Sequence, residues 1–223
     1  MPNRLRPVAS LAADAILVGD PGRALMLAQE LLEKPKMSNH ARGLWGYTGR
    51  TPAGAELTIQ STGIGGPSAA VVLADLAELG VRRAVRVGTC TALRPDLATG
   101  ALLDVVEAHA WGGPGRGEGE ATRPDAELAE RLSGALGERG RVGVVASLDT
   151  LHGGGAPAPV AAGDAADMQT AALLARGAEL DLAIAAVLVV TEATSGERLG
   201  EEAEQAAATR AGSAAATALS TST

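Results

Sequence analysis

The nine residues Ala15–Arg23, AILVGDPGR, set the pattern from which the fold follows. A short apolar run breaks into a turn of glycine, aspartate and proline, and helix-forming residues come after the turn. The pattern returns in residues 57–68, LTIQSTGIGGPS, and the apolar segment that starts at Val81 ends in RVGTC, residues 86–90. Strands that break repeatedly into turns and helices predict an α/β fold.

Two of these turns carry an arginine, Arg23 and Arg86, at the end of an expected strand. Ligands of open α/β sheets collect at this edge. Glycine lets the backbone approach a ligand closely, and the start of a helix offers N–H groups to an anion. The planar guanidinium group fits phosphate oxygens. The residues alone therefore indicate an oxyanion site, and the competing structural interpretation is an ion pair with an acidic neighbour such as Asp20.

Composition narrows the class of protein and of ligand. The chain has 223 residues and a formal net charge of −7, which argues against nucleic acid or an anionic membrane as partner. Phenylalanine is absent, and the aromatic residues are Trp45, Tyr47 and Trp111. We therefore expect an aliphatic core, and a bound base would receive little aromatic stacking.

The cysteine and histidine residues give weaker indications of the cellular compartment and of metal binding. Cys90 is the only cysteine, so no disulfide can form within the chain, which fits a reducing compartment. The three histidines have no metal-ligand spacing, so we expect no metal site. No apolar stretch reaches the length of a membrane span, and we expect a cytoplasmic protein with no membrane partner.

The pattern of apolar residues predicts alternating strands and helices over residues 1–223, with no linker, so that we expect a single α/β domain. We expect strands at 15–18, 45–48, 56–60, 81–87, 101–108, 141–147 and 182–190. We expect helices at 24–32, 68–79, 125–136, 167–180 and 201–219, with Ser68 and Asp125 as caps. Residues 111–123 are interpreted as a loop, and 153–163 as a mobile segment that covers the site.

In this order, the motifs resemble the nucleoside phosphorylase family, which includes the hexameric purine nucleoside phosphorylases and the uridine phosphorylases. The resemblance rests on six segments, namely ILVGDPGR (16–23), RGLWGYTG (42–49), STGIGGPSAAVVLADL (61–76), RVGTC (86–90), DMQTAAL (167–173) and VVTE (189–192). It implies a central mixed, twisted sheet flanked by helices. The implied reaction is phosphorolysis, in which inorganic phosphate attacks C1′ of a nucleoside and releases the free base and a pentose 1-phosphate.

The resemblance also implies roles for residues. Phosphate would be bound by Gly19, Arg23, Arg42, Arg86 and Thr89, with Arg42 supplied across an interface to a neighbouring subunit. This sharing implies a homo-oligomer built from dimers, expected to be a hexamer. The nucleoside would contact Ile64, Cys90, Thr91, Ala146, Asp167, Met168 and Gln169, and catalysis would rest on Glu192 and Arg86. The implied substrates are a nucleoside and inorganic phosphate, without a further cofactor.

Three positions depart from the family pattern. Gln169 falls where the family carries a ribose-binding glutamate, Glu192 falls where the purine-type enzymes carry an aspartate, and Gln205 falls at the position of an arginine. Glu192 can donate a proton to a purine nitrogen if its pKa is raised, which favours purine over uridine. Two alternatives stay open: a relative that binds phosphate or ribose phosphate without ordinary turnover, and a nucleosidase that uses water.

Overall fold

The computed structural model describes residues 4–111, 120–149 and 163–220. The strands are β1 (Asp14–Val18), β2 (Glu33–Asn39), β3 (Gly46–Arg50), β4 (Glu56–Ser61), β5 (Arg83–Ala92), β6 (Leu102–Trp111), β7 (Glu120–Thr122), β8 (Gly140–Leu148), β9 (Ala165–Asp167) and β10 (Ala183–Glu192). The helices are α1 (Pro21–Leu31), α2 (Gly65–Glu78), α3 (Ala126–Leu136), α4 (Thr170–Glu179) and α5 (Glu201–Ser220), with short 3-10 turns η1 (Ala41–Gly43) and η2 (Gly137–Arg139).

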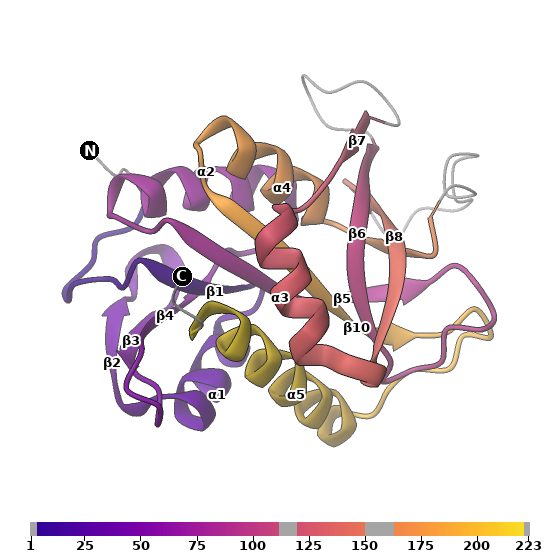
Figure 1. The fold of residues 1–223 in the computed structure, drawn as a ribbon, viewed down its shortest axis with the longest axis horizontal. Coiled ribbons are helices and arrows are strands. Elements are labelled where there is room, and N and C mark those ends of the chain that lie inside the picture. The colour runs from indigo at the N-terminus through magenta and orange to yellow at the C-terminus, as the bar shows by residue number, and fades with distance from the viewer. Residues whose placement is uncertain (1–3, 112–119, 150–162, 221–223) are drawn as a thin grey trace.

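All the described strands belong to one mixed sheet (Figure 1). β5 pairs in parallel with β1 on one side and with β10 on the other, and β1 pairs in parallel with β4. The last residues of β5 turn to β9, so that β5, β10, β6, β8 and β9 close into a ring. β4, β3 and β2 extend the sheet beyond this ring as an antiparallel meander.

Helices cover both faces of the sheet, and each face has its own hydrophobic core (Figure 1). Buried residues of α2 and α4 pack with one face, among them Leu73 and Leu173. Buried residues of α1, α3 and α5 pack with the other face, among them Leu27 and Leu132. The mixed sheet flanked by helices was predicted correctly. Both cores are mainly aliphatic, and Tyr47 with the adjacent Trp45 adds aromatic side chains to one of them.

The predicted elements match the structure, apart from their bounds, except in five places. β5 was expected to end at Val87 in a turn, but it continues to Ala92 because β10 and β9 pair with its last residues, so Arg86 lies within the strand and not at its end. β2, with the sequence EKPKMSN, was not predicted, because its residues show no alternation of apolar and polar side chains. β7 lies inside the segment interpreted as a loop, and β9 takes the residues at which a helix was expected to begin. The hydroxyl of Ser68 donates to Thr62 O at 2.6 Å, and α2 already begins at Gly65, so the predicted cap was wrong.

Other local predictions hold. Asp125 caps α3 by accepting a hydrogen bond from the backbone N–H of Leu128 at 2.9 Å. Gly80 follows α2 with φ of 102°, a conformation that glycine adopts without strain. The segment predicted to cover the site, 153–163, lies outside the described residues except for Gly163. Among the described helices, none combines the length and the apolar character needed to span a membrane.

The parallel strands β1, β4, β5 and β10 end at one edge of the sheet. The turn after β1 contains Gly19, and the turn after β4 contains Gly63, whose φ is 75°. Since most of the predicted site residues follow or end these strands, this edge is where the site is assembled.

Candidate functional site

Arg86 lies within β5, and its buried side chain carries a positive charge near the edge where the parallel strands end. Its backbone is paired with Leu17 of β1 and Ala186 of β10, and only 4% of the residue is exposed. Gly88, two residues further along the same face, leaves room for the guanidinium group, because a Cβ there would lie 2.6 Å from Arg86 Nη2. The side chain therefore passes over Gly88 towards the carboxyl end of the strand.

The guanidinium group of Arg86 is held by three side chains from the start of α4. Nε donates to Thr170 Oγ1 at 3.0 Å, Nη1 donates to Gln169 Oε1 at 2.7 Å and Nη2 donates to Asp167 Oδ2 at 2.9 Å. A guanidinium group carries five N–H donors. Two donors of Arg86 therefore have no partner among the described residues.

Asp167 ends β9 and is almost fully buried, with 1% of the residue exposed. Besides Arg86, its carboxylate accepts hydrogen bonds from the hydroxyls of Ser147 and Thr170 and from the backbone N–H groups of Gln169 and Thr170. The start of α4 adds favourable helix-dipole charge. A buried carboxylate with this many donors stays in place, and loss of its arginine would cost about 3–5 kcal/mol of stability.

Gln169 connects this ion pair to the glycine-rich turn after β4. Its Oε1 accepts from Arg86 Nη1 and from Thr62 Oγ1, the latter at 3.2 Å. Its Nε2 donates to the carbonyl oxygens of Gly63 at 2.6 Å and Gly65 at 3.3 Å. The amide therefore ties the β4–α2 turn to β5 and α4.

Gly19 comes to the same place from the end of β1. A Cβ at Gly19 would lie 3.5 Å from Gly63 O and 3.7 Å from Gln169 Oε1. The structure thus brings Gly19, Arg86, Asp167 and Gln169 together from three segments of the chain. The sequence placed Arg86 at this edge, but it gave no sign that Thr62, Ser147 and Thr170 complete the network.

Arg23 and Thr89 lie on the other face of the sheet. Arg23, on α1, forms an ion pair with Glu204 of α5, while Asp20 caps α1 by accepting from the Arg23 backbone N–H. Thr89 shares the face of Val85 and Val87, which pack with α1 and α5, because alternate residues of a strand face opposite sides. No contact within the described part of the chain joins Arg23 to Arg86.

Arg42 is exposed in η1, and its φ of 59° is unusual for a residue with a side chain. No hydrogen bond or ion pair with the described residues holds its guanidinium group. Arg42 is therefore free to reach another molecule, but the structure does not bring it to Arg86. Of the five residues predicted to bind phosphate, the structure brings Gly19 and Arg86 close together. The other three, Arg23, Arg42 and Thr89, lie apart from them.

The residues expected to contact the nucleoside are divided between buried and open positions. Cys90 is buried in β5, and burial raises the pKa of its thiol, with a further increase from Asp167 and a decrease from Arg86. Ala146 is buried in β8, whereas Ile64 at the start of α2 is 83% exposed. Thr91 is paired with Ala166 of β9 and faces Glu192 of β10 in register.

Glu192 ends β10 with its carboxylate partly exposed. Gly196, with φ of 83°, lets the chain turn back, and Arg198 Nε then donates to Glu192 Oε2 at 3.2 Å. Gln205 instead donates to Glu201 within α5 at 3.3 Å. Arg198 is thus the cation beside Glu192, and the sequence signal that was missed is a basic residue across a glycine turn.

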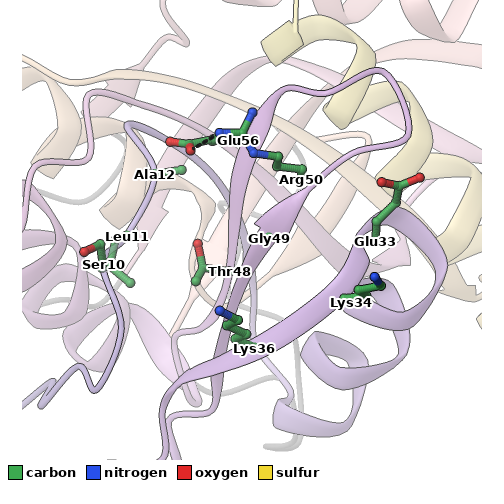
Figure 2. Close-up of a pocket in the computed structure, with 10 residues that line it drawn as sticks. All are labelled: Ser10, Leu11, Ala12, Glu33, Lys34, Lys36, Thr48, Gly49, Arg50 and Glu56. Carbon is green, nitrogen blue, oxygen red and sulfur yellow. Dashed lines mark hydrogen bonds and ion pairs between the residues drawn. The ribbon is translucent and has the colours of Figure 1, made fainter.

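The hollows of the surface differ in which of these residues they contain. A hollow of about 450 Å³ at the β2–β3 end of the sheet is lined by Ser10, Leu11, Ala12, Glu33, Lys34, Lys36, Thr48, Gly49, Arg50 and Glu56 (Figure 2). It contains no predicted site residue. A larger hollow of about 580 Å³ between α2 and α4 reaches Met168 and Ser147, next to Asp167. The second hollow therefore reaches the residues around Asp167, whereas a third hollow of about 390 Å³ between α1 and α5 is lined by Arg23 and Glu204.

Comparisons with known proteins agree with this architecture. The purine nucleoside phosphorylase DeoD-type of Oceanobacillus iheyensis is 43% identical over 101 residues, 41% of this chain and 43% of the relative. That of Caldanaerobacter subterraneus is 38% identical over 99 residues, 44% and 41% of the two chains. These matches span about two fifths of the relatives' length. The protein of the same name from Alkaliphilus metalliredigens is 28% identical over 206 residues, 86% of this chain and 88% of the relative.

The fold has a close counterpart among solved structures. The crystal structure of purine nucleoside phosphorylase from Toxoplasma gondii in complex with immucillin-H superimposes with a TM-score of 0.82 at 22% identity, covering 94% of this chain and 92% of that chain. The family model described as the phosphorylase superfamily matches residues 14–222. With nearly the whole chain covered by that match, this protein belongs to the phosphorylase superfamily.

Proposed function

We propose that this chain is a purine nucleoside phosphorylase, which uses inorganic phosphate to cleave the N-glycosidic bond and releases a free base and a pentose 1-phosphate. The observation that carries the proposal is the buried Arg86, which keeps two N–H donors without a partner in the described part of the chain. The relatives support it, because those matched in the comparisons are named purine nucleoside phosphorylases. Inorganic phosphate is then the co-substrate, and no further cofactor is required.

The chemistry suits an arginine fixed in this way. The sugar develops positive charge between an anionic nucleophile and a departing base, so a catalyst gains most by holding phosphate in line with C1′. A cation and backbone donors that are already in place need no reorganisation during the reaction. In this proposal Arg86 and the Gly19 backbone bind phosphate, and Arg23 joins them only after leaving Glu204.

Glu192 is proposed to give a proton to the leaving base. Arg198 holds the carboxyl group by its hydrogen bond and stabilises the carboxylate that is left behind. With Gln169 and Glu192 at positions where the family carries other residues, the nucleoside side of the site is altered in this proposal. The hollow between α2 and α4, which reaches Met168, is the space proposed for the nucleoside.

Arg42 is proposed to complete the site of a neighbouring subunit in a homo-oligomer built from dimers. Its exposed position and its left-handed backbone support this role, because such strained residues gather at ligand contacts. The hexameric state and the cytoplasmic location remain predictions from the sequence.

The direct test measures release of free base. The purified chain is incubated with inosine, adenosine, guanosine and uridine, with and without phosphate. The proposal expects release from the purine nucleosides that depends on phosphate. Release that is independent of phosphate would identify a nucleosidase, and no release together with phosphate binding would identify a binding protein.

The role of Glu192 is tested by Glu192→Gln. Loss of the proton donor should lower purine turnover by about 10²–10⁴-fold while phosphate affinity is kept. Glu202→Gln is the matched control, because Glu202 is an exposed carboxylate of α5. Turnover of Glu192→Gln equal to that of the control would remove Glu192 from the mechanism.

A further inference from the structure

The amide of Gln169 is committed to contacts inside the protein. Only 3% of the residue is exposed. Its oxygen accepts from Arg86, and its nitrogen donates to the carbonyls of Gly63 and Gly65. The one hydroxyl proton of Thr62 is shared between Val18 O at 3.0 Å and Gln169 Oε1 at 3.2 Å. Both amide donors and one lone pair of the oxygen are therefore used within the protein, and the amide nitrogen has no donor left for a bound sugar.

The two donated bonds require an amide. A carboxylate at this position would place a negative oxygen against two carbonyl oxygens, and the β4–α2 turn would lose both of its ties to α4. Charge gives a second reason. Arg86 and Asp167 form a pair of opposite charges, so the buried cluster around Gln169 is neutral overall. A carboxylate would make it negative directly beside the two free donors of Arg86.

We propose that Gln169 is a positioning residue of the anion site rather than a ligand of the sugar. It fixes the Gly63–Gly65 turn against Arg86, and it keeps the cluster neutral so that the remaining donors of Arg86 attract an anion. The part of this inference that concerns the anion rests on the proposed function, since that anion is phosphate. The part that concerns the turn does not.

The test compares the wild-type chain with Gln169→Glu and Gln169→Met by titration calorimetry with inorganic phosphate. At pH 7.5 the Kd of Gln169→Glu should rise about tenfold or more, because one unit of charge is added at contact distance. The ratio of that Kd to the wild-type Kd should shrink at pH 5.5, where inorganic phosphate is singly rather than doubly charged and its repulsion by the introduced carboxylate is roughly halved. Gln169→Met adds no charge, so its ratio to wild type should be the same at both pH values.

The charged groups that face the introduced carboxyl are Arg86 of β5 and Asp167 of β9, which form an ion pair at 2.9 Å. Cys90 of β5 stays neutral, because burial raises the pKa of its thiol. Gln29→Glu is the control, because Gln29 is an exposed glutamine of α1. It should bind phosphate as the wild type does at both pH values.

Amide hydrogen exchange, measured in the absence of phosphate, tests separately whether Gln169 holds the turn at residues 63–66. Residues 63–66 should exchange faster in Gln169→Glu and Gln169→Met than in the wild type, and at the wild-type rate in Gln29→Glu. Unchanged exchange would overturn the positioning role. Equal phosphate Kd values for wild type and Gln169→Glu, or a ratio that does not change with pH, would overturn the role of charge. If the wild type binds no phosphate, the proposed function and the anion part of the inference fail together.

Discussion

A single absent side chain allows Arg86 to lie where it does. At Gly88 a Cβ would lie 2.6 Å from Arg86 Nη2 and 2.7 Å from Leu188 Cδ2. We predict that Gly88→Ala lowers the free energy of unfolding by about 1–3 kcal/mol and moves the guanidinium group off Asp167. Urea denaturation measures the first effect, and a crystal structure of the variant measures the second.

Gly134 provides the control for this substitution. It lies within α3, and a Cβ there would have no neighbour within 4 Å. Gly134→Ala should therefore raise stability by about 0.5–1 kcal/mol through helix propensity. If both substitutions changed stability in the same direction, the close approach of Arg86 would not be the reason why position 88 requires a glycine.

The thiol of Cys90 is predicted to be unreactive in the folded protein. It is 2% exposed, and burial raises its pKa, so neither access nor thiolate is available. A disulfide reagent such as DTNB at pH 8 should leave the native chain unmodified and should react with one thiol in guanidinium chloride. Fast modification of the native protein would show that Cys90 faces an open site.

At the scale of elements, a carboxylate links β6 to α3. The hydroxyl of Ser133 donates to Asp104 Oδ2, and burial raises the pKa of Asp104 although this hydrogen bond lowers it. A carboxyl whose pKa is higher in the folded state binds its proton more tightly when folded. The folded state is therefore penalised above that pKa, and the penalty disappears as the pH falls below the unfolded value of about 4.

Asp104→Asn should remove this penalty while it keeps an acceptor for Ser133. The variant should be more stable than the wild type at pH 7, and the difference should shrink towards pH 4. Urea denaturation at both pH values measures it. A difference that is constant with pH, or a less stable variant at pH 7, would contradict the assigned shift.

Elements with a strong apolar pattern were predictable, and elements held by distant partners were not. β1 and β10 are apolar runs bounded by turns, and α3 has a capping aspartate, so local sequence was sufficient. The second half of β5 was not predictable in this way, because pairing with β10 and β9 extends the strand to Ala92. β9 has only three residues, and it exists because Thr91 and Val145 lie on either side to pair with it. Such tertiary pairing leaves no periodic signal in the sequence.

The same contrast holds for the candidate site. Arg86 could be singled out by its glycine context, but its partners lie more than 80 residues away in the chain. Arg23 could be singled out in the same way, yet its partner Glu204 is 181 residues distant. Motifs therefore identify the cations, whereas only the fold reveals which carboxylate neutralises each of them.

Over the whole molecule, the account depends on one site, where the ends of β1, β4 and β5 meet. The hollow at the β2–β3 end also contains cations, Lys34, Lys36 and Arg50, and Arg50 is paired with Glu56 (Figure 2). These side chains are exposed, whereas Arg86 is buried and oriented by three partners. A preorganised cation binds an anion at a lower entropic cost, so Arg86 should be the stronger site.

A crystal of the wild-type protein grown or soaked in phosphate tests this claim most directly. The account predicts a tetrahedral anion within hydrogen-bond distance of the free Nη donors of Arg86 and of the Gly19 backbone, with Asp167 and Gln169 still in contact with the guanidinium group. Phosphate bound at Lys34 and Lys36 instead, with Arg86 enclosed as before, would contradict it.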